Sequence, residues 1–207
     1  GHALHSYYSD STQPYPYAGY RIFVAEVAST CNEALLIHYM LKQAKDKKEK
    51  AYLLNHFLEQ FKGTLYRQTM FAEFERDMHK LAAEGEALTA DLLCEKYYAL
   101  NRLYFGEDIV IDEEIAMEWA RIPHFYTPFY VYQYATGFSA AIALSQGILE
   151  RGESAVHDYM KFLTGGSSAD PIELLKLAGV DMSTPAPIQQ ALDVFEDLLN
   201  QMEALSE

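Results

Sequence analysis

The sequence predicts an all-α fold, and three observations support this prediction. Apolar residues recur at the spacing of one helix face through residues 24–41, 51–81, 88–104 and 188–205. Short alternating runs bounded by turn residues, which are typical of strands, are scarce. Glycines and capping residues stand where helices would end and begin. No repeat or long linker divides the chain, so we expect a single helical domain over residues 1–207.

The N-terminal part is expected to hold two helices joined by a loop. Pro14 and Pro16 stand among tyrosines in the segment 11–19. Proline removes a backbone donor and disfavours helical geometry in the residue before it. We therefore predict a non-helical loop over 11–19 that connects a helix at His2 to the helix of residues 24–41. Such a loop allows the two helices to face each other.

Helix boundaries can also be predicted for the rest of the chain. Thr89 and Asp112 are residue types that cap helix N-termini. The segment 170–207 is expected to pack as helices that end in an amphipathic one, and we assign it no chemistry. Glycine favours helix ends, and the predicted stops are Gly63, Gly85, Gly106 and the turn Gly165-Gly166-Ser167-Ser168.

Composition excludes several classes of function. A chain of 207 residues that is 50% hydrophobic is large enough for a buried core. A net charge of −14 argues against nucleic acid as a partner, because polyanions need clustered Lys and Arg. No apolar run reaches the roughly 18 residues that a membrane span needs. Cys31 and Cys94 have no paired spacing, so we expect reduced core cysteines in a cytoplasmic protein.

The chain opens with Gly1-His2-Ala3-Leu4-His5, which matches the second half of an H-E-x-G-H zinc-peptidase helix. In the complete motif two histidines one helical turn apart bind Zn²⁺, and the glutamate between them is the general base. His2 would be the second histidine of this motif. We therefore expect the first histidine and the base glutamate to precede Gly1, so that the chain starts inside the motif.

Two carboxylates in the next predicted helix have the spacing that a metal site requires. Glu26 and Glu33 are seven residues apart, which places them on one helix face two turns from each other. One of them can contact a metal while the other orients a ligand. Taken alone, however, glutamates at helical spacing are usually solvated surface residues.

An aromatic run over residues 122–137 contains side chains that donate hydrogen bonds. A zinc hydrolase must stabilise a developing oxyanion, and tyrosine hydroxyls and a histidine can do so. By default, most of the 16 tyrosines of a helical protein are packing residues. Five members of the run are therefore candidates rather than assignments: His124, Tyr126, Tyr130, Tyr132 and Tyr134.

Several blocks in this order resemble oligoendopeptidase F, of the thimet oligopeptidase and neurolysin superfamily of zinc metallopeptidases. The resemblance extends over the whole chain, and ordered blocks are far more specific than any single motif. The blocks are residues 1–9, Thr12-Gln13-Pro14-Tyr15, residues 23–33, Arg67-Gln68-Thr69-Met70-Phe71-Ala72-Glu73-Phe74-Glu75, residues 124–137 and residues 174–181.

The resemblance implies a helical catalytic-domain fragment of a zincin-type oligopeptidase, which hydrolyses short peptides with zinc-activated water. It makes His2 the second zinc histidine and Glu26 the third protein ligand of a two-histidine, one-glutamate Zn²⁺ site. It places Glu33 behind that site, where a carboxylate accepts the free ring N–H of a ligating histidine. His5, three residues after His2, is expected to be packed rather than bound to metal.

The same resemblance makes His124, Tyr130 and Tyr134 the groups that bind substrate and stabilise the oxyanion. Tyr126 and Tyr132 stay in reserve, because the spacing of tyrosines in this branch differs from that in thimet oligopeptidase. The glycine-containing aromatic loop is of the kind that moves on substrate binding.

The sequence departs from the family pattern at the first zinc histidine and the base glutamate. Loss of a general base typically costs about 10²–10⁴ in rate, so we expect this polypeptide to be inactive by itself. We also expect self-association through apolar surface that the rest of the peptidase would cover. The alternative interpretation is a non-catalytic helical module that binds peptides or partner helices through its aromatic surface.

Overall fold

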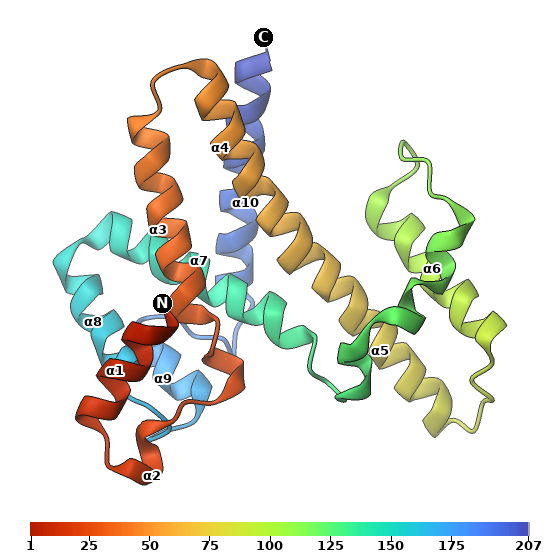
Figure 1. Ribbon diagram of the computed structural model, residues 1–207, viewed down its shortest axis with the longest axis horizontal. Helices are drawn as coiled ribbons and strands as arrows, with labels where there is room; N and C mark the ends of the chain where they lie inside the picture. Colours follow the sequence, from red (N-terminus) through yellow and green to blue (C-terminus); the bar gives the residue numbers. More distant parts are fainter. Residues whose placement is uncertain (207) are drawn as a thin grey trace. The chain divides into compact units, whose positions relative to one another are not determined.

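The computed structural model describes residues 1–206 and is all-α, as the sequence predicts (Figure 1). The described residues form α-, 3₁₀- and π-helices and no strand. They divide into two compact units. Unit 1 comprises Gly1–Lys62 and the described residues from Thr136 onward, and unit 2 comprises Gly63–Ala135. The single domain expected from the sequence stays a prediction, which unfolding of both units in one transition would support.

Unit 1 is a helical bundle in which α3 packs on α4 and α4 packs on α10 (Figure 1). The N-terminal helix α1 lies against both α3 and α8, and α8 lies against α9. Within residues 1–206, no helix is both long enough and apolar enough to cross a bilayer. The helices are α1 (His2–Thr12), α2 (Tyr15–Ala18), η1 (Ile22–Val24), α3 (Val27–Gln43), α4 (Lys47–Gln60), most of α7 (Tyr132–Arg151), α8 (Glu153–Leu163), α9 (Pro171–Leu177) and α10 (Ala186–Ser206).

The main core of unit 1 combines small and large apolar side chains. Ala140 and Ala141 of α7 are fully buried, and small side chains allow neighbouring backbones to approach closely. A Cβ added to Gly137 of the same helix would lie 3.8 Å from Val27 Cγ2. This core includes residues from the start of α3, which carries candidate site residues, so that the start of this helix is closely packed.

Unit 2 is built on α5 and α6, which pack together, with η3 against α6. Thr89 caps α6 as predicted, because its hydroxyl accepts the N–H of Leu92 at 3.3 Å. Asp112 precedes η3 without a capping hydrogen bond from its side chain. The helices are the π-helix η2 (Phe61–Tyr66), which starts in unit 1, α5 (Arg67–Ala83), α6 (Ala90–Phe105), η3 (Glu113–Arg121), η4 (Pro123–Tyr126) and the first residues of α7.

Three of the four predicted stops are confirmed and one is wrong. The turn at residues 165–168 follows α8, which ends at Leu163. Gly85 and Gly106 follow α5 and α6 with φ of 86° and 78°, a conformation that favours glycine. At Gly63 the chain instead continues through η2 into α5. The reason is packing: Phe61 and Leu65 on either side are 0% and 6% exposed, and their burial outweighs the roughly 1 kcal/mol that glycine costs a helix.

The loop predicted over residues 11–19 is also wrong in part. The helix α1 extends to Thr12, and residues 15–18 form the helical turn α2. Pro14 is the residue before that turn and Pro16 lies within its first two positions. Proline is tolerated there because the first N–H groups of a helix have no intrahelical acceptor.

Candidate active site

The two predicted zinc ligands of unit 1 lie next to each other. His2 is the first residue of α1, and Glu26 immediately precedes α3. The distance from His2 Nε2 to Glu26 Oε2 is 3.2 Å, and the side chains are 51% and 56% exposed. Two atoms bound tetrahedrally to one Zn²⁺ at about 2.0–2.1 Å would lie roughly 3.3 Å apart. The donor set and its spacing therefore fit a shared metal ion.

The carboxylate of Glu26 is held by the first turn of α3. Ser29 Oγ donates to Glu26 Oε2 at 3.1 Å and to the backbone oxygen of the same residue at 3.0 Å. Hydroxyl groups of serine commonly bond in this way to residues three or four positions earlier. The oxygen that faces His2 is thus restrained by the helix that follows it.

A close approach at Gly1 brings the two ligands together. A Cβ at this position would collide with the backbone of Ser29 and lie 2.7 Å from the carbonyl carbon of Ala28. The start of α1 therefore rests directly on the start of α3, with no room for a side chain between the two backbones. Glycine at position 1 is required by this contact, which sets the spacing between His2 and Glu26.

His5 is a packed residue, as expected. It is 1% exposed, and its ring stacks on Tyr20 with 3.8 Å between centroids and 2° between planes. Desolvation by burial, followed by the nearby charge of His2, lowers the pKa of His5 to about 4. Its Nδ1 has no hydrogen-bond partner among the described residues. His5 is therefore neutral at physiological pH.

Glu33 lies on the exposed side of α3. The hydrogen bond described for its side chain comes from Gln60 Nε2, at 3.5 Å. None is described to a histidine, so its role behind the metal ligands stays a prediction. Within residues 1–206, no group of three or more His, Cys, Asp or Glu side chains is arranged to hold a metal ion. The described residues thus supply a pair of candidate ligands.

In unit 2 the structure brings His124, Tyr130 and Tyr134 together. Tyr134 Oη lies 3.3 Å from His124 Nε2 and 3.5 Å from Tyr130 Oη. The His124 ring is also 5.6 Å from that of Tyr130, centroid to centroid, at an interplanar angle of 23°. We call these three residues the aromatic cluster. It concentrates two hydroxyls and one imidazole at one place, a combination that can donate hydrogen bonds to an oxyanion.

The two reserve tyrosines differ from the cluster in their surroundings. Tyr126 is 87% exposed and Tyr132 is 42% exposed. The hydrogen bonds described within the aromatic cluster run through Tyr130 and Tyr134. This geometry favours Tyr130 and Tyr134 as candidates, while the catalytic role of each tyrosine stays a prediction.

Glu75 supports the aromatic cluster, and the sequence interpretation gave it no role. Phe129 has a φ of 59°, the one positive value among the non-glycine residues described. Its N–H donates to Glu75 Oε1 at 2.8 Å, and its ring stacks on His79 with 4.6 Å between centroids. Glu75 is 6% exposed. The next residue is Tyr130, so the buried carboxylate fixes the turn that presents this tyrosine.

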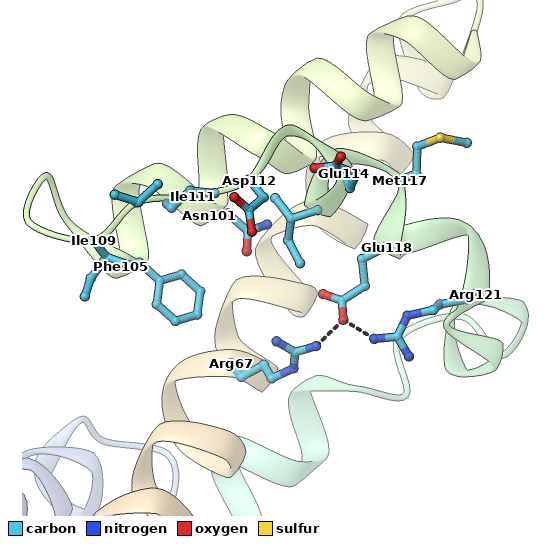
Figure 2. Close-up of a pocket in the computed structure, with 12 residues that line it drawn as sticks. Arg67, Asn101, Phe105, Ile109, Ile111, Asp112, Glu114, Met117, Glu118 and Arg121 are labelled. Atoms are coloured by element: carbon cyan, nitrogen blue, oxygen red, sulfur yellow. Dashed lines mark hydrogen bonds and ion pairs between the residues drawn. The ribbon is translucent and has the colours of Figure 1, made fainter.

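A second buried carboxylate, Glu118, ties η3 to α5 and α6. Figure 2 shows Arg67 and Arg121 converging on it at the edge of a cavity of about 910 Å³. Each guanidinium donates to Glu118 Oε1 at 2.5 Å, and Tyr97 Oη donates to Oε2 at 2.6 Å. Burial by itself raises the pKa of Glu118, but the hydrogen bond from Tyr97 and the charges of both arginines outweigh it, so the pKa is lowered.

The Glu118 network is a structural clamp rather than a reactive site. Its carboxylate is ionised and already accepts three hydrogen bonds, which leaves little capacity for a substrate. Arg67, the first residue of one block of the family resemblance, is thereby explained by its position in the frame of unit 2.

The chain belongs to peptidase family M3, whose family model matches residues 1–194. It is 59% identical over 205 residues to oligopeptidase PepF of Bacillus subtilis (strain 168), covering 99% of this chain and 31% of that protein. It is 45% identical over 207 residues to the chromosomal oligoendopeptidase F of Lactococcus lactis subsp. cremoris, covering 100% of this chain and 34% of that protein. The chain thus spans about a third of the length of these relatives.

Solved structures agree with these relatives. The crystal structure of oligoendopeptidase-F from Enterococcus faecium superposes with a TM-score of 0.89 at 46% identity, over 99% of this chain and 37% of that one. The crystal structure of a putative peptidase from Chlamydophila abortus gives a TM-score of 0.93 at 45% identity, over 99% of this chain and 34% of that one. The resemblance to oligoendopeptidase F is therefore confirmed.

Proposed function

We propose that this chain is part of a zinc metalloendopeptidase that hydrolyses short peptides. The observation that supports it most directly is the 3.2 Å separation of His2 Nε2 and Glu26 Oε2, in a chain of peptidase family M3. Relatives named oligopeptidase and oligoendopeptidase support short peptides as substrates. The proposed setting is the cytoplasm, in line with the two free cysteines.

In this proposal His2 and Glu26 hold Zn²⁺, and Glu33 orients a ligating histidine. Ser29 keeps the Glu26 carboxylate directed at the metal through its 3.1 Å hydrogen bond. When bound, Zn²⁺ polarises the scissile carbonyl and lowers the pKa of a bound water to about 7. The cluster of His124, Tyr130 and Tyr134 donates hydrogen bonds to the oxyanion that develops on the substrate.

We further propose that the chain does not hydrolyse peptides by itself. His2 and Glu26 are two candidate metal ligands, and no group of three such side chains is found among the described residues. A site with two protein ligands binds Zn²⁺ weakly, and loss of a general base costs about 10²–10⁴ in rate. Metal-dependent turnover of a peptide by the isolated chain would contradict this part of the proposal.

The zinc site is tested by measuring Zn²⁺ stoichiometry and affinity in a longer peptidase polypeptide that contains this sequence. Glu26→Gln should abolish stoichiometric zinc, and Glu33→Gln should weaken binding by about 10–100-fold, as loss of an orienting partner does. The matched control is Glu49→Gln on the exposed surface of α4, where the side chain caps only its own helix start. Full zinc occupancy in Glu26→Gln would refute the assignment.

Self-association remains part of the proposal, because apolar side chains are exposed along α3. Leu36, Tyr39 and Met40 are 58%, 63% and 40% exposed, and their spacing places them on one side of the helix. Contiguous exposed apolar residues commonly mark a contact surface. A monomeric sedimentation coefficient at high protein concentration would contradict this expectation.

A second candidate function is a non-catalytic helical module that binds peptides. The observation that favours it is the incomplete set of metal ligands among residues 1–206. A longer polypeptide that binds peptides equally well after complete removal of metal, and never cleaves them, would support the module. Zinc-dependent cleavage that is lost in Glu26→Gln would support the peptidase.

A further inference from the structure

Unit 2 contains a second cavity, of about 390 Å³, with walls that are largely apolar. Its volume lies within the range of about 300–1,000 Å³ that is typical of ligand pockets. The walls come from several elements: Phe74 and Met78 of α5, Leu93 of α6, Trp119 of η3, and Ile122 and Phe125 at η4. We call this space the Trp119 cavity.

Two residues in the wall of the Trp119 cavity are linked to the aromatic cluster through neighbours in the sequence. Phe125, in its wall, directly follows His124. Glu75, also in its wall, accepts the N–H of Phe129, the residue before Tyr130. The same carboxylate therefore belongs to the cavity wall and holds the turn that presents a cluster tyrosine. An occupant of the cavity would lie beside Glu75, the carboxylate that holds this turn.

The indole N–H of Trp119 is closed off from the cavity. Trp119 Nε1 is buried, and no hydrogen bond to it is found among the described residues. A buried indole N–H normally has an acceptor. The charged group of the wall, Glu75, already accepts the N–H of Phe129 at 2.8 Å.

We propose that the Trp119 cavity is a specificity pocket that takes an apolar side chain of the peptide. This inference rests on the proposed function, because it assigns the pocket to a peptide substrate. An apolar occupant is favoured over a lysine, since an ammonium group would lose its hydration among phenylalanine, methionine and leucine side chains. Leucine and phenylalanine side chains match both the volume of the cavity and the apolar character of its walls.

The position of the single tryptophan makes the test direct. Trp119 is the one tryptophan of the chain, so its fluorescence reports on the cavity without zinc or turnover. The probes are blocked peptides, acetyl-Gly-Gly-X-Gly-Gly-amide, with Phe, Leu, Lys or Gly at X, titrated into the 207-residue chain with excitation selective for tryptophan. We expect saturable changes with Phe and Leu, and affinities at least about tenfold higher than with Lys or Gly.

A pair of variants locates the response. Leu88 lines the cavity and is 41% exposed, so Leu88→Arg places a charge at its edge. Leu103 lies on α6 outside the cavity lining and is 71% exposed, which makes Leu103→Arg the matched control. Leu88→Arg should weaken the Phe peptide by at least about tenfold and Leu103→Arg should leave it unchanged, with far-UV circular dichroism confirming that both fold.

Three results would overturn the inference: no saturable response to any peptide, equal affinity for the Lys or Gly peptide, or a response that survives Leu88→Arg. None of these depends on zinc, whereas the proposed function is decided by the Glu26→Gln experiment. Zinc-dependent hydrolysis without a cavity response would remove the pocket alone. A selective cavity response in a metal-free protein that never cleaves peptides would support the pocket and remove the catalytic proposal.

Discussion

The two units support their candidate residues by different physical means. In unit 1, His2 and Glu26 are both more than half exposed, and their spacing depends on backbone contact at Gly1 above an apolar core. In unit 2, the turn before Tyr130 is held by a carboxylate, Glu75, that is 6% exposed. Exposure of the two proposed ligands suits a site that must admit a metal ion and water, whereas a buried carboxylate fixes a backbone turn.

This difference predicts where single substitutions do most damage. A buried charge is costly once a partner is lost, because neither water nor another group replaces that partner. Unit 2 contains two buried carboxylates, Glu75 and Glu118. In unit 1, by contrast, the helix that carries His2 contains a buried neutral histidine, His5. Unit 2 should therefore be sensitive to loss of charge, and unit 1 to gain of charge.

The largest effect is expected for Glu118→Ala. The substitution leaves the Arg67 guanidinium, 34% exposed, and the buried hydroxyl of Tyr97 without their shared acceptor. Breaking such a pair costs about 3–5 kcal/mol. The free energy of unfolding in urea, followed by fluorescence of Trp119 in the same unit, measures this loss.

The control for Glu118→Ala is Glu114→Ala, which lines the same cavity on the exposed surface of η3. It should change the unfolding free energy by less than about 0.5 kcal/mol. A loss of similar size in both variants would show that general charge, rather than the clamp, stabilises unit 2.

Acid should destabilise unit 1 before it affects the clamp of unit 2. Burial first, then the charge of His2, lowers the pKa of His5 from 6.5 to about 4. The unfolded chain therefore binds an extra proton between these values, and stability falls as pH drops through this window, by up to about 3 kcal/mol. The lowered pKa of Glu118 preserves its contribution until the pH falls below the unfolded value of about 4.3.

The measurement is the free energy of unfolding of unit 1 at several pH values, from hydrogen exchange of amides in α1 and α3. His5→Phe retains a ring against Tyr20 and removes this titrating group, so the loss between pH 6.5 and 4 should become smaller. The part that remains belongs to His38 of α3, whose pKa is also lowered by burial. The control is His157→Phe, at a side chain that is 76% exposed. An unchanged pH profile in His5→Phe would exclude His5 as the source.

The sequence predicted the regular elements well where local chemistry determines them. Thr89 caps α6, and Gly106 ends it in a left-handed conformation, because both effects depend on adjacent residues. At Gly63 the prediction was wrong, since buried neighbours rather than local preference keep the chain helical. The prediction at Pro16 was wrong in the same direction, because the first turn of a helix accepts proline.

The supports of the candidate site were harder to predict than its members. Resemblance named His2, Glu26 and the aromatic cluster from ordered blocks. The contact between Glu75 and Phe129 joins residues 54 positions apart, and no local pattern encodes it. Pro128 indicates a turn. The next residue, Phe129, has a positive φ, but phenylalanine rarely adopts this conformation, so the sequence does not predict it.

A smaller effect is expected for Gly1→Ala. The added methyl would collide with the Ser29 backbone, so α1 must shift and carry His2 away from Glu26. In the longer peptidase polypeptide we expect about tenfold weaker Zn²⁺ binding, which is the lower end of the range for groups that orient a ligand. Competition with a chromophoric chelator measures this affinity. Gly19→Ala is the control, because nothing lies within 4 Å of its added Cβ. Equal affinities in the two variants would contradict a positioning role for Gly1.

The smallest expected effect is a gain, at Gly63→Ala. Gly63 lies inside η2 without a positive φ, and an added Cβ would meet no atom within 4 Å. Alanine restricts the unfolded chain and favours helix, so the free energy of unfolding should rise by about 0.5–1 kcal/mol. Gly85→Ala, at a φ of 86°, should instead lower it by a similar amount. Opposite signs in urea titrations of Trp119 fluorescence would establish that Gly63 is a helical residue, whereas destabilisation by both would restore the helix end predicted there.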